Sequence, residues 1–209
     1  KFKIDNKSTT LVIDQYNINP FPHYKNLEDK KSLLKNGNKN NFSKKLKEFI
    51  NLNKVVLEAG SGTCQLSNYL SINTNNKIYA LDPTTKSLEL GAKFAKENHI
   101  KNTIFVQGDI LDLENVFNNN IFDFVYCSGV LHHTENPYKG FKNLVKTLKK
   151  NGYVVIGLYN KYGRFRTFFR QFIYKRISKK LALFLDPMLR KMKKKLEFNK
   201  YEAWVKDQY

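Results

Sequence analysis

One segment of the chain, residues 55–70, joins a short apolar run, a glycine-rich turn and the start of an amphipathic helix. The apolar run is predicted to be a buried strand with Glu58 near its carboxyl end, and Gly60 and Gly62 follow in the turn. Glycine adopts positive φ without strain and lets the backbone approach a ligand closely. The start of the next helix offers amide groups to an anionic group, whereas Glu58 would repel phosphate and suits an ammonium group. The segment therefore predicts an α/β domain with a ligand cradle at the end of its first strand.

The turn matches neither of two common nucleotide-binding motifs. The dinucleotide fingerprint requires a third glycine where this chain has Gln65. A phosphate-binding P-loop requires Gly-Lys followed by Ser or Thr, which is absent after these glycines. The remaining pattern, Glu-x-Gly-x-Gly, favours a ligand with an amino-acid head and a ribose over a pyrophosphate.

Further apolar runs follow at the spacing of strands that alternate with helices. One ends at Asp82, 24 residues after Glu58, and the next ends at Asp109. A fourth run begins at residue 122 and passes through Cys127 into a loop. Alternating strands and helices indicate a doubly wound parallel sheet with helices on both faces. Ligands bind at the carboxyl ends of such strands, and an acid that ends the second strand accepts hydrogen bonds from ribose hydroxyls.

The segments between the runs have helical periodicity. Helices are predicted over residues 42–53, from the glycine turn onward, over 87–98 and over 138–150. In the first of them, Phe42, Leu46, Phe49 and Ile50 share one face. The last is predicted to end at Gly152, where a C-cap glycine belongs, before a fifth strand that reaches Tyr159.

In this order, the motifs resemble those of the class I S-adenosylmethionine-dependent methyltransferases, whose first motif is usually E/D-x-G-x-G-x-G. Cys64 stands in place of the last glycine of that motif. The resemblance implies a Rossmann-like fold that binds S-adenosyl-L-methionine, with Asp109 near the adenine amine and Ile110 on the adenine ring. The cofactor-binding residues that it implies are Glu58, Gly60, Gly62, Asp82, Asp109, Ile110 and Cys127.

The loop after the fourth strand carries His132 and His133, and in this family the loop faces the donor methyl group. Methyl transfer is a direct displacement that needs the acceptor held in line, and often a base that takes its proton. Imidazole titrates near neutral pH and is suited to that task. A catalytic role for His132 or His133 is one hypothesis; the other is that they hydrogen-bond the loop or the cofactor.

The acceptor site is expected to include the N-terminal segment, residues 1–41. Pro20 and Pro22 force an extended path there. We expect a lid over the substrate pocket that carries Tyr16, Phe21 and Tyr24; the alternative is a strap packed over the edge of the sheet. Just past the fifth strand, Asn160 and Arg164 either contact an acceptor or cap the ends of secondary-structure elements.

Charge is distributed unevenly along the chain. The formal net charge is +19, and residues 161–195 contribute thirteen Lys or Arg against one acid, Asp186. Aromatic and aliphatic residues recur there at helical spacing, so residues 161–209 are predicted to be a basic amphipathic helical region. Such helices contact membrane surfaces or RNA, although their apolar stripe can also face the protein's own core. The Asn/Asp-Pro-Pro-Tyr/Phe motif of nucleic-acid amino-methyltransferases is absent after the fourth strand, which argues against adenine N6 chemistry.

The two cysteines lie in or beside the predicted cofactor site, and neither has a metal-binding spacing. Cys64 could have a lowered pKa near a helix start, or could simply be a small residue in a glycine's place. No metal is expected. The chain has no run of about 18 apolar residues and no signal peptide, so we expect a cytoplasmic protein, with peripheral attachment to the membrane as the alternative.

Residues 42–160 are therefore predicted to be a methyltransferase core between an N-terminal segment (1–41) and the basic region (161–209). Two further strands usually follow the fifth strand in the family, and none is recognisable here, so we expect a fragment or a variant with a shorter sheet. The predicted reaction moves a methyl group to an O, N or C nucleophile on a small-molecule or lipid-like acceptor. The alternatives are an RNA methyltransferase and a non-catalytic cofactor-binding domain.

Overall fold

The computed structural model describes residues 13, 16–18, 20–24, 27, 29–160, 172, 176, 181, 184 and 187–195. The chain divides into two compact units, Lys1–Leu158 and Tyr159–Tyr209. The first unit contains the sheet and the helices around it, and the second contains α9 (Pro187–Lys195). The expectation about strands after the fifth concerns residues that lie mostly outside this described part.

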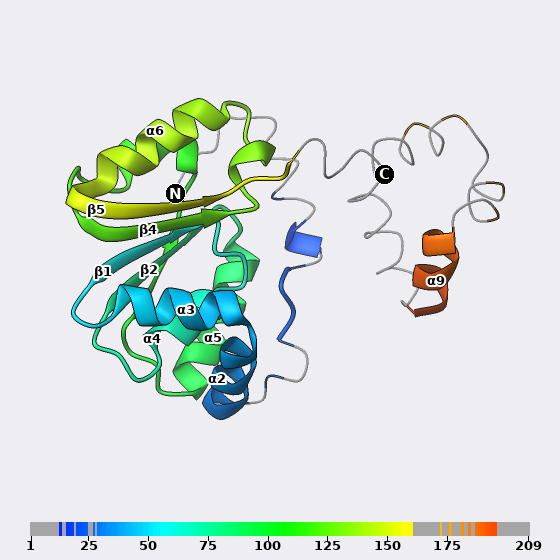
Figure 1. Cartoon of the computed structure of the whole chain (residues 1–209), viewed down its shortest axis with the longest axis horizontal. Coiled ribbons are helices and arrows are strands. Elements are labelled where there is room, and N and C mark those ends of the chain that lie inside the picture. Colours follow the sequence, from blue (N-terminus) through cyan, green and yellow to red (C-terminus); the bar gives the residue numbers. More distant parts are fainter. Residues whose placement is uncertain are drawn as a thin grey trace. The chain divides into compact units, whose positions relative to one another are not determined.

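Five parallel strands form one sheet in the order β3–β2–β1–β4–β5 (Figure 1). They are β1 (Val55–Ala59), β2 (Lys77–Asp82), β3 (Thr103–Gln107), β4 (Phe122–Ser128) and β5 (Leu148–Gly157). The order reverses between β1 and β4, which makes the carboxyl ends of these two strands the switch point where α/β sheets bind ligands. The predicted Rossmann-like parallel sheet is confirmed.

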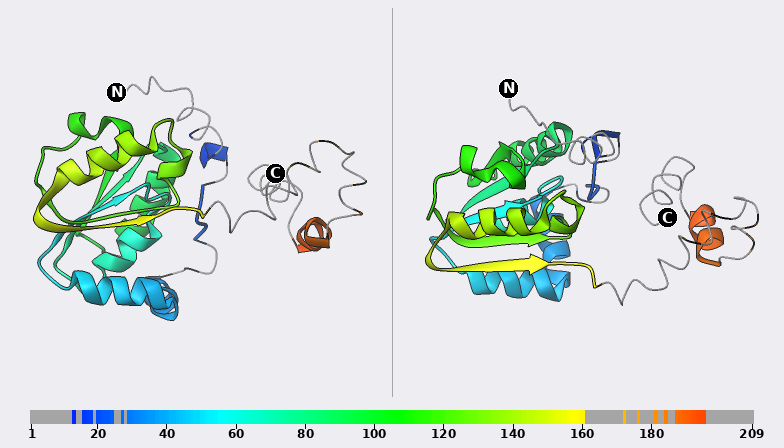
Figure 2. Two further views of the ribbon diagram at one scale, coloured as in Figure 1. Left: turned by 45° about the horizontal axis from the view of Figure 1, so that its top comes forward. Right: turned by 90° about the horizontal axis from the view of Figure 1, so that it is seen from above.

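Helices cover both faces of the sheet. The helical elements of the first unit are α2 (Lys30–Lys39), α3 (Asn41–Ile50), α4 (Gln65–Ser71), α5 (Thr85–Glu97), η1 (Ile110–Asn115), η2 (Leu131–His133) and α6 (Pro137–Thr147). In Figures 1 and 2, α3 and α6 lie on opposite faces of the sheet. The predicted helices over 42–53 and 87–98 correspond to α3 and α5, with ends that differ by one to three residues.

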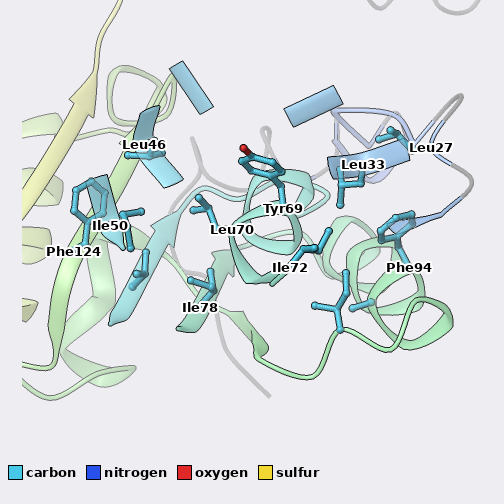
Figure 3. Close-up of a cluster of buried hydrophobic side chains, with 13 residues drawn as sticks. Leu27, Leu33, Leu46, Ile50, Tyr69, Leu70, Ile72, Ile78, Phe94 and Phe124 are labelled. Carbon is cyan, nitrogen blue, oxygen red and sulfur yellow. The ribbon is translucent and has the colours of Figure 1, made fainter. Parts of the chain in front are cut away.

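The alternation of side chains along the strands divides the core into two clusters. Val56 of β1 belongs to the cluster beneath α2–α5, and the next residue, Leu57, belongs to the cluster beneath η1 and α6. Figure 3 shows the first cluster, in which Leu46, Ile50, Leu70 and other side chains of these helices meet the sheet. Successive residues of a strand point to opposite faces, and each fully buried aliphatic side chain contributes about 1.5–3 kcal/mol.

The predicted apolar face of α3 is only half correct. Leu46 and Ile50 are buried, whereas Phe42 and Phe49 are 52% and 59% exposed. The ring of Phe49 contacts the rings of Phe124 and Tyr153 only at their edges, with centroids 6.0 and 5.2 Å apart. These two phenylalanines therefore lie at the rim of the helix–sheet contact.

The predicted end of the last helix is wrong. α6 ends at Thr147, Leu148 is its C-cap, and Gly152 lies inside β5. Leu148 pairs with Phe122 and Tyr153 pairs with Phe124, so residues 149–152 bulge out of the ladder. Leu148 is buried in the core cluster beneath α6, and this packing favours its place in the sheet over one in the helix. Asn151, with φ 66°, takes the left-handed position in place of the predicted glycine.

Candidate functional site

The glycine loop between β1 and α4 is tied to the carboxyl end of β2. The amides of Gly60 and Ser61 both donate to the carbonyl oxygen of Leu81, over 2.8 and 2.9 Å. Gly60 and Gly62 have φ of +78° and +51°, and the Gly62 amide donates to Asp82 Oδ2 over 2.8 Å. The first two predicted motifs are therefore joined directly, because the strands that precede them are neighbours in the sheet.

The space beside the two loop glycines is filled by other parts of the chain. A Cβ at Gly60 would lie 2.3 Å from Val130 Cγ2, and one at Gly62 would lie 2.2 Å from the carbonyl oxygen of Phe21. From the sequence, we attributed the glycines at these two positions to the close approach of a ligand to the backbone. The structure gives them a second reason, since the chain's own packing leaves no room for a side chain.

Gly129, which directly follows β4, borders open space. Its φ is +74°, and a Cβ there would meet no atom within 4 Å. The Gly129 amide donates to the carbonyl oxygen of Gly157 over 2.9 Å, which holds it between the ends of β4 and β5. The sequence analysis missed this residue, although a glycine immediately after a buried strand is a usable signal.

Asp82 lies buried at the end of β2. Its Oδ2 accepts from the Gly62 amide, and its Oδ1 accepts from the amide of Thr84 over 2.9 Å and from the Thr84 hydroxyl. Burial raises the pKa of this carboxyl, and the three hydrogen bonds oppose that change. A carboxylate has about four lone-pair sites, so the protein leaves room for about one further donor, such as a ribose hydroxyl.

Glu58 lies buried one residue before the end of β1. Burial raises its pKa to about 7; the Ser67 hydroxyl, which donates to Oε2, and the Ser67 backbone lower it, and nearby Asp82 raises it. Part of the first turn of α4 is therefore already bonded to the chain's own carboxylate. A buried carboxyl that titrates near neutrality favours a cationic partner such as an ammonium group.

Asp109 and Ile110 open η1, just past the end of β3. The Asp109 carboxylate accepts from the Leu111 amide over 2.9 Å and caps the turn. The Ile110 side chain is buried in the core cluster beneath α6. The assignment of both residues to the adenine end of a cofactor stays a prediction.

Cys64, which stands in place of the last glycine of the motif, has a backbone conformation that favours glycine. It caps α4 with φ 61° and ψ 26°, in the left-handed region, and its side chain is fully buried. Burial raises the pKa of Cys64, so the lowered pKa considered above is wrong. Cys127 is also buried, and burial raises its pKa to about 12. Both residues are free thiols, and Cys64 behaves as a small residue in a glycine's place.

His132 and His133 occupy η2, in the exit loop of β4. Their ring centroids are 4.1 Å apart, and the rings are tilted by 49°. His132 is half-buried and His133 is exposed. The β4 exit loop thus presents the His133 imidazole to solvent, and the catalytic role stays a prediction.

The segment of residues 20–24, which we call the N-terminal strap, lies against the glycine loop. The Thr63 amide donates to the carbonyl oxygen of Phe21 over 3.2 Å, and the Thr63 hydroxyl donates to that of Pro22. The Tyr24 hydroxyl donates to the Thr63 carbonyl oxygen over 2.9 Å. Thr63 therefore uses three of its polar groups to hold the strap, which the sequence analysis did not foresee.

Tyr24 has a packing role in this strap. Its ring stacks on that of Phe94 with centroids 4.6 Å apart, and its hydroxyl accepts from Asn68 Nδ2 over 3.1 Å. Phe21, by contrast, is 63% exposed. Tyr16 is half-buried in a short helical stretch over residues 16–18. Phe21 is therefore exposed, whereas the Tyr24 hydroxyl is already bonded within the domain, and their contact with an acceptor stays a prediction.

The two predicted acceptor residues past β5 do not belong to the first unit. Asn160 belongs to the second unit, and Arg164 lies outside the described residues. Among the residues that the structure describes, no group of His, Cys, Asp or Glu could hold a metal ion. Within the same residues, every helix is too short or too polar to cross a lipid bilayer.

Comparison with known proteins matches a stretch of the chain that includes residues of both units. Residues 50–207 match the family model of a methyltransferase domain. Over 106 residues the chain is 30% identical to the ubiquinone biosynthesis O-methyltransferase of Rickettsia canadensis. The aligned residues make up 51% of this chain and 43% of that protein. The enzyme of the same name from Rickettsia conorii is also 30% identical over 106 residues, with 51% and 35% covered. The chain thus spans less than half the length of these curated relatives.

Solved structures agree with the fold. A putative S-adenosyl-L-methionine-dependent methyltransferase of Methanococcus maripaludis superposes over 92% of this chain and 88% of its own, with a TM-score of 0.52 and 18% identity. A putative methyltransferase of Bacillus halodurans covers 62% and 56%, with a TM-score of 0.52 and 25% identity. These likenesses support the Rossmann-like arrangement of the sheet.

The residues at the carboxyl ends of the strands fit S-adenosylmethionine. Glu58 is a buried carboxyl suited to an ammonium group, Asp82 keeps a lone-pair site for a hydroxyl, and Gly129 at the end of β4 borders open space. Since the methyltransferase family model matches more than half of this chain's residues, the chain belongs to the class I S-adenosylmethionine-dependent methyltransferases.

Proposed function

We propose that this chain moves the methyl group of S-adenosylmethionine to an oxygen, nitrogen or carbon nucleophile on a small-molecule or lipid-like acceptor. The observation that carries the proposal is the position of three buried carboxylates at the carboxyl ends of neighbouring strands: Glu58 in β1, Asp82 in β2 and Asp109 after β3. In this proposal Glu58 meets the ammonium group, Asp82 the ribose and Asp109 the adenine amine. The bound cofactor supplies an electrophilic methyl group on a sulfonium ion.

The β4 exit loop is the proposed acceptor side of the site. Gly129 borders open space there, and His133, four residues later in the chain, is exposed. We assign His132 and His133 the task of orienting the acceptor or taking its proton. Phe21 and Tyr16 of the N-terminal segment are proposed to contact the acceptor.

The relatives narrow the class of acceptor. They are named for O-methylation in ubiquinone biosynthesis, which favours an oxygen nucleophile. The exposed ring of Phe21 beside the glycine loop supports an acceptor with an apolar part. A phenolic hydroxyl on a lipid-like molecule meets both conditions.

Calorimetric titration with S-adenosylhomocysteine, with NAD as the control ligand, tests the cofactor site. We expect a Kd in the micromolar range for the first ligand and no binding of the second. Binding of NAD alone, or of neither ligand by a folded protein, contradicts the proposal. Transfer of a labelled methyl group to phenolic and lipid-like acceptors then tests the reaction, and cofactor binding without transfer to any acceptor favours the non-catalytic alternative.

The basic region is proposed to hold the protein at an anionic membrane surface, where a lipid-like acceptor is found. Residues 161–195 carry thirteen Lys or Arg against one acid. In the described α9, Leu189 is buried while Arg190, Lys191, Lys193 and Lys194 are exposed. Basic amphipathic helices bind anionic lipid surfaces.

RNA contact is the second candidate, because the same excess of positive charge suits a phosphate backbone. Co-sedimentation with vesicles separates the two. We expect binding to vesicles that contain an anionic lipid and none to vesicles of neutral lipid. Retention of labelled RNA with no binding to anionic vesicles favours the RNA alternative instead.

A further inference from the structure

Asn143, in the second turn of α6, lies buried against the segment that follows β3. Its Nδ2 donates to the carbonyl oxygens of Ile110 and Leu111, each over 3.1 Å. An asparagine amide has two donor hydrogens, so both are used on this one segment.

The same segment is held from its other side by Asp109. The Asp109 carboxylate accepts from the Leu111 amide over 2.9 Å, and the Asp109 carbonyl oxygen accepts from the Asp112 amide over 3.0 Å. Residues 109–111 are thus fixed by one side chain of their own and by one side chain of α6.

The close approach of α6 depends on Gly140, which lies three residues before Asn143 on the same face of the helix. A Cβ at Gly140 would lie 2.8 Å from Leu131 Cδ2 and 3.2 Å from Ile110 Cγ2. Because no side chain intervenes there, the amide of Asn143 reaches the carbonyl oxygens of Ile110 and Leu111. Gly140 and Asn143 together form a clamp on residues 109–111.

We infer that Asn143 is a positioning residue for the adenine end of the cofactor site, an inference that rests on the proposed function. Without its amide, the buried Ile110 carbonyl oxygen and the partly buried Leu111 carbonyl oxygen lose their donor, and the segment relaxes to find others. Asp109 then moves relative to the adenine amine. Recognition of that amine needs a carboxylate at hydrogen-bond distance. Displacing Asp109 should therefore reduce both the affinity for the cofactor and the preference for adenine over other bases.

Asn102 provides a matched control. Its Nδ2 donates to the carbonyl oxygens of Ser71, Thr74 and Asn76, over 3.1, 3.1 and 2.9 Å. Asn102 precedes β3, so it lies at the end of the strand opposite to Asp109. Replacing it removes the same kind of bond without touching the proposed adenine end.

The experiment measures the dissociation constants of S-adenosylhomocysteine and of its inosine analogue, which carries a carbonyl in place of the adenine amine. We expect the wild-type protein to prefer the adenine form at least tenfold. Asn143→Leu should reduce that preference at least fivefold, while Asn102→Leu should leave it unchanged. A folded Asn143→Leu variant with the wild-type preference overturns the inference and leaves the proposed function standing.

Two further outcomes are decisive. Should Asn143→Leu fail to fold, Gly140→Ala disturbs the same segment by pushing α6 away, and a preserved base preference in that variant overturns the inference. Failure of the wild-type protein to bind S-adenosylhomocysteine overturns the proposed function, and this inference with it.

Discussion

The hydroxyl of Tyr24 donates a 2.9 Å hydrogen bond to the carbonyl oxygen of Thr63, and so joins the N-terminal strap to the glycine loop. In return, the amide and the hydroxyl of Thr63 donate to the carbonyl oxygens of Phe21 and Pro22 in the strap. Gly62, the residue before it, donates to Asp82. Thr63 and Gly62 together link the strap to the proposed ribose-binding carboxylate through two consecutive residues of the chain.

Thr63→Val should loosen the strap while it preserves the shape of the side chain. The change leaves the partly buried carbonyl oxygen of Pro22 without its hydroxyl donor, at a cost of about 1–3 kcal/mol. Amide hydrogen exchange should become faster at Phe21, His23 and Tyr24, the strap residues that carry an amide hydrogen, and the free energy of unfolding in urea should fall.

Thr74→Val is the control for this prediction. The Thr74 hydroxyl donates to the carbonyl oxygens of Leu70 and Ser71, after the glycine loop has ended. It should lower stability without faster exchange in the strap. Equal acceleration of strap exchange in both variants would mean that Thr63 has no specific role there.

Asp82→Asn should weaken binding of S-adenosylhomocysteine by about 1.5–3 kcal/mol, the usual value of hydrogen bonds to a charged group. The variant keeps the size of the side chain but loses the charge that the ribose hydroxyls would meet. Calorimetry measures the loss. Asp123→Asn is the control, because Asp123 bonds the Val55 amide at the opposite end of the sheet; unchanged affinity in Asp82→Asn would show that the ribose lies elsewhere.

Glu58 should make the folded protein less stable as the pH rises from about 4.5 to about 7. Burial raises its pKa from 4.5 to about 7 in the native state, so the native state holds a proton that the unfolded chain has released. The stabilisation is complete below the unfolded pKa and is lost through this window, by up to about 3 kcal/mol. Urea unfolding across pH 4.5–8 measures the slope, and Glu58→Gln should flatten it.

The same titration should change cofactor affinity in the opposite sense. A cationic ammonium group prefers the ionised carboxylate, so S-adenosylhomocysteine should bind more tightly as the pH rises through about 7. Glu58→Gln should remove most of this dependence. An affinity that stays constant over the same range in the wild-type protein would contradict the assignment of Glu58 to the ammonium group.

Lys47→Met should destabilise the domain by about 1–3 kcal/mol, since two backbone carbonyls lose a charged donor. Lys47 Nζ donates to the carbonyl oxygens of Tyr69 and Ile72, over 2.7 and 2.5 Å, at the end of α4. Thermal unfolding measures the change. Lys44→Met, which removes an exposed pair with Glu48 at 4.0 Å, should cost at most about 0.5 kcal/mol, and an equal loss in both variants would refute the capping role of Lys47.

Local pattern was enough to predict the sheet and the acids at its edge. Glu58 and Asp82 each stand at or near the end of an apolar run, and a parallel sheet brings such ends to one edge. The helices α3 and α5 were predicted because their periodicity extends over many residues. Predictions that depended on a single position were wrong in two places. Leu148 belongs to β5 and not to the predicted helix, and burial raises the pKa of Cys64 where a lowered pKa had been considered.

By itself, the sequence determined the parallel α/β fold, the family and the order of the carboxylates, because each depends on residues that are consecutive or regularly spaced. Only the tertiary structure decided that Thr63 holds the strap, that Gly129 borders open space and that Asn143 bonds the turn after β3. Asn143 is 33 residues from Ile110, and Thr63 is 39 residues from Tyr24. Contacts over such separations arise when helices pack on a sheet, and no local period in the sequence records them.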